Sequence, residues 1–152
     1  MPSGDIAGVA NYYGQSAATF EFDPQTGKFG AQLNKKILEF PGYTPQPGQI
    51  GEPGNDNTSQ ATSHPHQIVT HPWLDVMYLP DLGEDLIGVY SIGKNGTLSN
   101  LTQYQMPYGH GPRHLAISQD GRWLYALFEL AAEVGTFSID LETGLLTKVG
   151  EE

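Results

Sequence analysis

The sequence predicts an all-β fold in which about three four-stranded antiparallel units follow one another along the chain. Gly and Pro together make up about a fifth of the 152 residues (19 and 11), which favours frequent turns over long helices. Short apolar runs alternate with turn sequences along the whole chain. The order of strands and turns then recurs at a constant spacing, as it does in the blades of a β-propeller.

The first unit begins without the innermost strand that the later units contain. Residues 6–13 (IAGVANYY) are typical of a strand. Residues 16–22 (SAATFEF) alternate apolar and polar side chains and lead into a turn at residues 23–27. One or two further strands are expected within residues 29–40, where residues 35–39 also fit a helical turn.

Residues 42–63 differ in composition from the rest of the chain. They are rich in Pro and Gly, and then in Asn, Asp, Ser and Thr, with no regular apolar pattern. This composition predicts a long irregular loop. Loops of this length are uncommon in compact domains and often serve as functional lids or insertions.

Strand patterns resume after this loop, in two sets of four. Each run is short, contains β-branched or aromatic residues, and is bounded by turn residues. The expected strands are residues 66–70, 76–80, 86–92 and 98–105, and then 113–117, 123–128, 133–139 and 145–149.

One strand-and-turn motif occurs three times. Residues 18–27 (ATFEFDPQTG) match residues 135–144 (GTFSIDLETG), and residues 88–92 (GVYSI) begin a third copy. The copies start 70 and 47 residues apart, and removal of a loop of roughly 23 residues leaves 47 in both cases. A β-sandwich would not give this internal identity. We therefore expect one domain, residues 1–152, with blades at about 5–41, 64–107 and 108–150 around the loop at 42–63.

The repeat also aligns polar residues. Asn11, Asp81 and Glu129 are each expected to end the second strand of their copy, while His66 and His114 correspond at a shift of 48 residues. In a blade the innermost strand begins, and the next strand ends, at the same face. The predicted group at one mouth of the central channel is Asn11, His66, Asp81, Arg113 and Glu129.

Charge excludes several classes of partner. The chain has 7 Lys and Arg against 17 Asp and Glu, a net charge of −10, and no cluster of basic residues. We expect no binding to nucleic acid or to anionic membrane surfaces, because both depend on clustered cations. A small anionic substrate is compatible with this charge if one or two basic residues are focused in a cleft. The chain contains no Cys, which excludes disulfides, thiolate metal sites and a Cys nucleophile.

Nothing in the sequence predicts a membrane span or a signal peptide. Apolar runs stay well short of the ~20 residues that a span needs, and the first residues lack a basic and then apolar segment. We expect a cytoplasmic protein. Secretion is the alternative, because Asn57, Asn95 and Asn100 each begin an Asn-X-Ser/Thr sequence.

Several segments resemble the lactonase family of seven-bladed propellers, which includes the 6-phosphogluconolactonase type and the fungal carboxymuconate lactonizing enzymes. They are residues 109–130 (GHGPRHLAISQDGRWLYALFEL), 64–72 (HPHQIVTHP), 78–90 (YLPDLGEDLIGVY) and 9–29. The resemblance implies a site for a small anionic lactone, either a sugar-acid lactone similar to 6-phosphogluconolactone or a muconate-type lactone. It implies hydrolysis or lactonization without a cofactor or metal.

The same resemblance assigns roles to three residues. The family's active-site His, Arg and Glu match His66, Arg113 and Glu129. It also implies seven blades, whereas this chain accounts for about three, so the expected fold is a partial β-propeller whose ring is not closed. We expect impaired catalysis and self-association through open blade edges. The alternative function is a catalytically inactive fragment that acts as a binding module.

The chemistry of each residue leaves other interpretations open. Arg113 can bind an anion with its planar guanidinium or simply pair with a surface carboxylate. Glu129 can transfer a proton, orient a neighbour, or be a solvated charge at a strand end. Asp81 and Asn11 are candidates for substrate binding, or residues of a solvated loop and a structural turn, respectively.

The histidines have two possible functions. His66 can act as an acid or base. It can instead bind a metal together with His64 and His71, in a metal-dependent lactonase. Otherwise His64 and His71 are expected to be structural, and His114 is expected to point into its blade.

Overall fold

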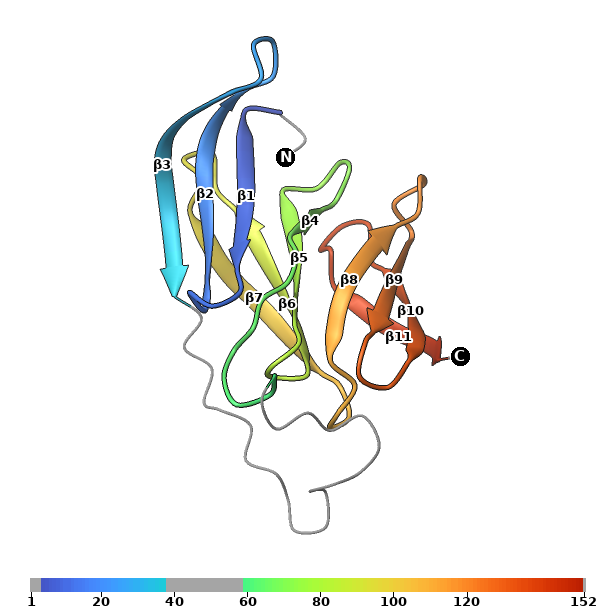
Figure 1. The fold of residues 1–152 in the computed structure, drawn as a ribbon. Coiled ribbons are helices and arrows are strands. Elements are labelled where there is room, and N and C mark those ends of the chain that lie inside the picture. Colours follow the sequence, from blue (N-terminus) through green and yellow to red (C-terminus); the bar gives the residue numbers. More distant parts are fainter. Residues whose placement is uncertain (1–3, 38–58, 152) are drawn as a thin grey trace.

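In the computed structural model, which describes residues 4–37 and 59–151, the chain forms three antiparallel sheets and no helix (Figure 1). Consecutive strands pair with each other, so each sheet is a meander. The predicted all-β fold is confirmed. The strands are β1 (Ile6–Asn11), β2 (Ser16–Asp23), β3 (Lys28–Ile37), β4 (Val69–Thr70), β5 (Val76–Asp81), β6 (Leu86–Ile92), β7 (Leu98–Gln105), β8 (Pro112–Ile117), β9 (Trp123–Phe128), β10 (Glu133–Ile139) and β11 (Leu146–Glu151).

The structure decides two alternatives that the sequence left open in the first unit. Of the one or two strands expected after the first turn, one continuous strand, β3, is present, so the first sheet has three strands in the described part of the chain. A strand rather than a helical turn covers residues 35–37. Most of the loop predicted at residues 42–63 lies outside the described residues, and residues 59–62 form turns and bends.

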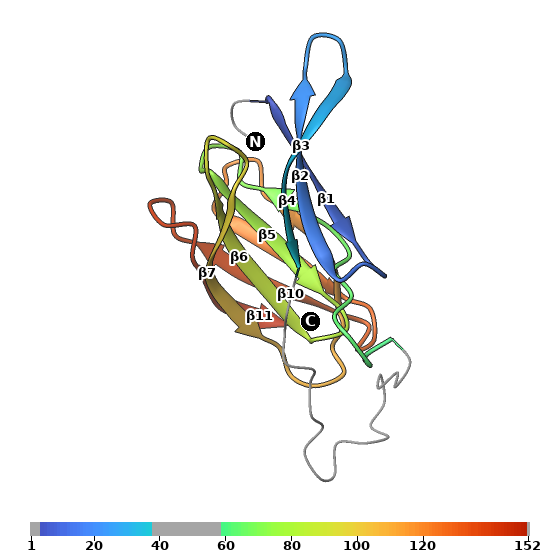
Figure 2. The same ribbon diagram turned by 90° about the vertical axis from the view of Figure 1, so that its left-hand side faces the viewer.

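The three sheets stand one behind another in chain order, with the β4–β7 sheet in the middle (Figures 1 and 2). Strand β5 shows why. Its residues Met77 and Leu79 pack in one core cluster with Ala17 of β2, while Val76 and Tyr78 pack with the β8–β11 sheet. Because successive side chains of a strand point to opposite faces, β5 is buried along its whole length.

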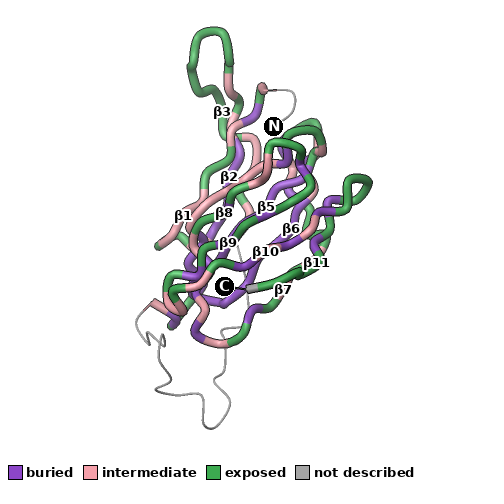
Figure 3. The backbone as a smooth tube through the Cα atoms, turned by 90° about the vertical axis from the view of Figure 1, so that its right-hand side faces the viewer, coloured by how far each residue is buried: buried purple, intermediate pink, exposed green. Residues whose placement is uncertain are grey.

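Among the described residues, the β8–β11 sheet is covered on one face only. Along β9 buried and exposed residues alternate, with Leu124, Ala126 and Phe128 in the core. Figure 3 views the molecule from the side of this sheet. Its outer face carries the exposed side chains of Trp123, Tyr125, Leu127 and Val134.

Polar contacts also join neighbouring sheets. The Tyr78 hydroxyl donates to the Gly144 carbonyl over 2.8 Å, and the Leu146 amide donates to the Tyr104 hydroxyl over 2.8 Å. Burial raises the pKa of the Tyr78 phenol. The Thr19 hydroxyl likewise donates to the Gly96 carbonyl over 2.8 Å. Each sheet is therefore fixed to the next by a buried hydrogen bond as well as by apolar contact.

The repeat of 47 residues is confirmed by strand register, with one correction. Asn11 pairs with Ser16 and Asp81 pairs with Leu86, and in the third sheet the same place is taken by Phe128, which pairs with Glu133. Glu129 was expected at this position but lies one residue beyond it. Left-handed residues mark the same point of each turn: Gln15, Asp85 and Ala132.

The starts of the innermost strands follow the same shift. Pro65 bridges to Asp81, and Pro112 pairs with Phe128. His66 therefore corresponds to Arg113 rather than to His114. The strand expected at residues 66–70 is also shorter than predicted, since only Val69–Thr70 is regular.

Within residues 4–37 and 59–151, no helix is long and apolar enough to cross a membrane.

Candidate functional site

A hollow of about 280 Å³ opens where the ends of the three sheets meet. Its wall comes from the turns after β1, β5 and β9, and from the starts of the two innermost strands. The lining residues are Tyr12, Tyr13, Ser59, His66, Leu82, Arg113, Glu129 and Leu130.

The corrected repeat explains why these residues meet. Tyr12, Leu82 and Glu129 directly follow the equivalent strands β1, β5 and β9, which end at Asn11, Asp81 and Phe128. Strand β1 is the first of its sheet and corresponds to the second strand of the other two sheets. The hollow is therefore built from equivalent positions of successive blades. A shift of one residue along the strand would exchange Glu129 for the buried Phe128.

Arg113 and Glu129 form an ion pair at the hollow, with 2.8 Å between Nη1 and Oε2. The β8–β9 hairpin brings them together, and the Glu129 amide donates to the Gly111 carbonyl over 2.9 Å. A register irregularity between Pro112 and His114 turns the Arg113 side chain out of the regular alternation. Both side chains are 40% exposed. Such a pair contributes only about 0.2–1 kcal/mol, so an anionic ligand can replace Glu129 at little cost.

His66 lies beside this pair. Its amide donates to the Pro80 carbonyl over 3.0 Å, and the centre of its ring is 4.8 Å from that of Tyr12. Burial lowers the pKa of His66 from its ordinary value of 6.5, as do the charges of Arg113, His114 and His64, while Glu129 raises it. The imidazole is therefore mainly neutral at pH 7 and able to accept a proton.

Tyr12 and Tyr13 were not predicted in the site. Tyr12 stacks on the His64 ring, with 4.2 Å between ring centres. The Tyr13 ring stands nearly perpendicular to the Tyr12 ring and is largely exposed. An apolar wall of this kind suits the carbon face of a small ring. The signal was present in the repeat, because Tyr12 is equivalent to Glu129 once the register is corrected.

Two residues predicted for substrate binding lie elsewhere. The Asn11 amide donates to the Ser16 hydroxyl over 3.1 Å and so closes the turn between β1 and β2. Asp81 is fully buried and accepts hydrogen bonds from Ser63 and from backbone amides. Neither residue is among those that line the hollow, and their role as substrate contacts stays a prediction.

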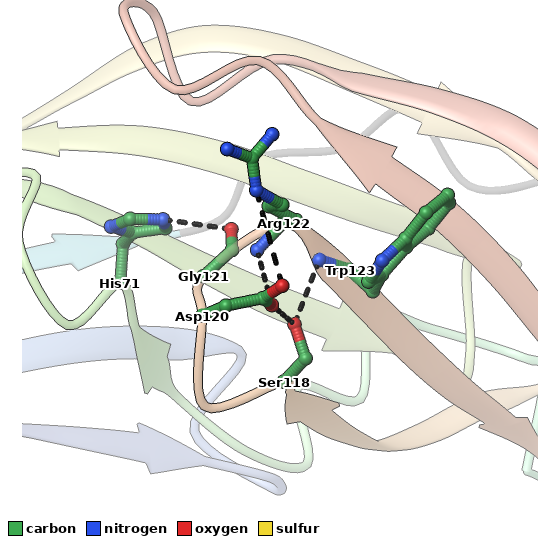
Figure 4. A network of polar contacts seen from close by, with 6 residues as sticks. All are labelled: His71, Ser118, Asp120, Gly121, Arg122 and Trp123. Carbon is green, nitrogen blue, oxygen red and sulfur yellow. Dashed lines mark hydrogen bonds and ion pairs between the residues drawn. The ribbon is translucent and has the colours of Figure 1, made fainter.

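The structure contradicts the alternative of a metal site built from His64, His66 and His71. His71 is buried, and its Nδ1 accepts from the amides of Trp73 and Leu74, so Nε2 carries the proton and donates to the Gly121 carbonyl (Figure 4). His64 instead contacts the Ser59 carbonyl. Among residues 4–37 and 59–151, no three His, Cys, Asp or Glu side chains are grouped so that they could hold a metal ion.

His114 differs from its prediction as well. It is exposed instead of pointing into the blade, and its ring centre lies 6.2 Å from that of His66. The irregularity at Pro112–His114 is the physical reason, since it places both Arg113 and His114 outside the core.

The chain is similar in sequence to known proteins of one family. A model of the family described as "Lactonase, 7-bladed beta-propeller" matches residues 1–151. A 6-phosphogluconolactonase of Formosa agariphila is 32% identical over 141 residues, which are 90% of this chain and 36% of that protein. A 6-phosphogluconolactonase of Pectobacterium carotovorum is 35% identical over 104 residues, 67% of this chain and 31% of that protein. The chain spans about a third of the length of these relatives.

Solved structures agree in fold. A protein from Lactobacillus plantarum superimposes with a TM-score of 0.78 at 26% identity, over 99% of this chain and 39% of that one. A periplasmic gluconolactonase from Pseudomonas aeruginosa gives a TM-score of 0.76 at 25% identity, over 99% of this chain and 39% of that one.

Proposed function

The chain belongs to the lactonase family of seven-bladed β-propellers, and we propose that its hollow binds a sugar-acid lactone with an anionic group, similar to 6-phosphogluconolactone, and opens the ring. One observation carries the proposal. A guanidinium, a carboxylate and a mainly neutral imidazole from two neighbouring blades line the same hollow.

Arg113 is the proposed anion-binding residue. A guanidinium binds phosphate or carboxylate through a planar fork of N–H groups. Glu129 pairs with Nη1, and the buried Nε makes no hydrogen bond within the described part of the chain. The pair with Glu129 is exposed and therefore opens readily when an anion enters.

His66 is the proposed proton carrier. Its neutral imidazole accepts a proton from a water molecule as the water oxygen bonds to the lactone carbonyl carbon. The ring C–O bond then breaks, and the imidazolium returns the proton to the departing ring oxygen. Glu129 raises the proton affinity of His66 and supports the imidazolium that forms. The reaction balances with water alone, so the proposal includes no cofactor.

Ring opening by the 152-residue chain tests this proposal. The substrates are 6-phosphogluconolactone, unphosphorylated gluconolactone and a muconate-type lactone, each followed by acid release at constant pH. We expect Arg113→Ala to lower kcat/KM for the phosphorylated lactone by about 10- to 150-fold, since a charged hydrogen bond contributes about 1.5–3 kcal/mol. The loss for the unphosphorylated lactone should be smaller.

Arg122→Ala provides the matched control. Arg122 is also an exposed arginine of the β8–β11 sheet near a carboxylate, at the far end of β9 from the hollow. It should keep the wild-type rate. A rate no higher than the uncatalysed background for every lactone rejects catalysis by this polypeptide. Binding of a lactone without turnover would instead support the binding-module function.

A further inference from the structure

We propose that Asp81 and Asp85, two of the three buried carboxylates at the β5–β6 turn (Glu84 is the third), are positioning residues for the candidate site. Asp81 fixes the segment that carries His66, and Asp85 fixes the loop that carries Arg113. The catalytic meaning of this proposal rests on the proposed lactone opening, whereas its geometric content can be tested without any turnover.

Asp85 is fully buried and reaches into the neighbouring blade. Its Oδ2 accepts from the Gly109 amide over 2.8 Å, and its Oδ1 accepts from the Gly111 amide over 2.6 Å. Gly111 lies two residues before Arg113, and its carbonyl accepts from the Glu129 amide. One carboxylate therefore sets the backbone positions from which both members of the ion pair project.

Asp81 makes the corresponding connection to the other strand. Its Oδ1 accepts from the His64 amide over 2.7 Å, and its Oδ2 accepts from the Ser63 hydroxyl. The Leu82 amide donates back to the His64 carbonyl over 3.1 Å. These bonds hold the backbone two residues before His66.

The equivalent turns show that the carboxylates are not needed to form the turn itself. In the third sheet the same two positions are Phe128 and Ala132, and Ala132 adopts the same left-handed conformation as Asp85. Asp81 also accepts from the Gly83 and Glu84 amides of its own turn, but a turn of this shape forms without that carboxylate in the third sheet. What the two carboxylates add is contact with the segments that lead to His66 and Arg113.

Burial makes the ionised form of both carboxylates unfavourable. It raises the pKa of both Asp81 and Asp85 above the ordinary value of 3.8, although hydrogen bonds oppose the change. A raised pKa means that stability falls as the pH rises from 3.8 through the folded pKa. Buried carboxylates that reduce folding stability in this way are typical of residues that hold a functional site in place.

Two amide substitutions separate the roles, because they differ in which bonds survive. Each carboxylate oxygen of Asp85 accepts from one backbone amide, that of Gly109 or that of Gly111. In Asp85→Asn one of these oxygens becomes an NH₂ group, which cannot accept, so one of the two hydrogen bonds is lost. In Asp81→Asn the remaining oxygen keeps the backbone amides. The new NH₂ donates to Ser63, whose hydroxyl turns to accept. Asp85→Asn should therefore displace its loop, and Asp81→Asn should keep its segment.

The first measurement is the titration of the His66 imidazole by NMR. We expect Asp85→Asn to raise the His66 pKa toward the ordinary value, because the Arg113 charge that lowers it moves away. Loss of the Asp85 charge itself would act in the opposite direction and cannot imitate this result. Asp81→Asn should leave the His66 pKa near the wild-type value, while Asp81→Ala, which keeps no acceptor, should change it.

The second measurement is the KM for 6-phosphogluconolactone. Asp85→Asn should raise KM roughly three- to tenfold, since a misplaced guanidinium binds the anion less well. Asp140→Asn is the control: this exposed carboxylate also accepts two backbone amides, but at the far end of β10. It should change neither KM nor the His66 titration. If Asp85→Asn does not fold, Asp85→Glu moves the acceptors by one methylene and should change both values in the same direction.

The two proposals fail in different ways. If the wild-type chain opens no lactone but the His66 pKa rises in Asp85→Asn, the proposed function is wrong and the positioning role stands. If Asp85→Asn folds and leaves both the His66 pKa and KM unchanged, the positioning role is overturned. A fall in melting temperature alone, without either change, also overturns it, because it indicates a merely structural residue.

Discussion

The charge state of His66 is governed by a balance between its neighbours. Burial and the Arg113 guanidinium lower its pKa, whereas the Glu129 carboxylate raises it. Arg113 and Glu129 also bind each other, so either substitution disturbs the imidazole in a defined direction. This opposition makes His66 a sensitive reporter of the ion pair.

Neutral substitutions of the pair should shift the His66 titration in opposite directions. We expect Arg113→Gln to raise the pKa of His66, because a positive neighbour is lost, and Glu129→Gln to lower it, because a negative neighbour is lost. NMR titration measures both shifts, with Arg122→Gln as the control. Shifts of the same sign in the two variants would contradict the arrangement.

The lowered pKa of His66 also links stability to pH. The unfolded chain, with the ordinary value of 6.5, binds the proton more tightly than the folded chain does. The contribution of His66 is therefore fully present above pH 6.5 and is lost as the pH falls through the folded pKa.

At the scale of elements, the β5–β6 turn is packed more tightly than its counterparts. A Cβ atom at Gly83 would lie 1.7 Å from the Thr62 carbonyl oxygen, so the segment before His64 can approach only a glycine. The same approach allows the Asp81 carboxylate to reach the His64 amide. The turn and the incoming segment therefore form one packed unit.

Replacement of this glycine should be costly. We expect Gly83→Ala to lower the free energy of unfolding by about 1–3 kcal/mol, because the added methyl group forces the backbone of residue 62 away. Urea denaturation measures the loss. Gly150→Ala is the matched control, since nothing lies within 4 Å of a Cβ at that position. Equal stability of the two variants would show that the segment can move freely.

At the scale of the whole molecule, the outer face of the β8–β11 sheet is an apolar surface. Trp123, Tyr125 and Leu127 are 37%, 41% and 42% exposed. The equivalent Val76 and Tyr78 of the middle sheet are buried beneath the next sheet. The outer face thus has the chemistry of an interface between blades.

We therefore expect the 152-residue chain to self-associate through this face and its strand edges. Light scattering should give a mean mass that rises with protein concentration. The double substitution Tyr125→Lys and Leu127→Lys should reduce this rise, while Gln25→Lys, in the exposed β2–β3 turn, should not. A concentration-independent monomer would contradict the expectation.

The sequence by itself determined the features that depend on near neighbours in the chain. Alternation of side chains and turn residues located the strands, and the recurring motif revealed the spacing of 47 residues. The pairing of Arg113 with Glu129 was also accessible, because a short hairpin joins them. Strands, turns and a short hairpin are set by local backbone geometry, and the repeat is visible because the same local pattern recurs along the chain.

Only the tertiary structure decided which side chain of each repeat faces the hollow. Adjacent residues of a strand point in opposite directions. The sequence alignment of the blades was wrong by one residue, so it placed Glu129 at the strand end that Phe128 occupies and did not identify Tyr12 as a residue of the hollow. The roles of Asp81 and Asp85 were hidden for a related reason. Their hydrogen-bond partners, at His64 and Gly111, are distant in sequence. The composition of the loop predicted solvated acidic side chains, whereas neighbouring segments bury these carboxylates, which therefore form internal hydrogen bonds.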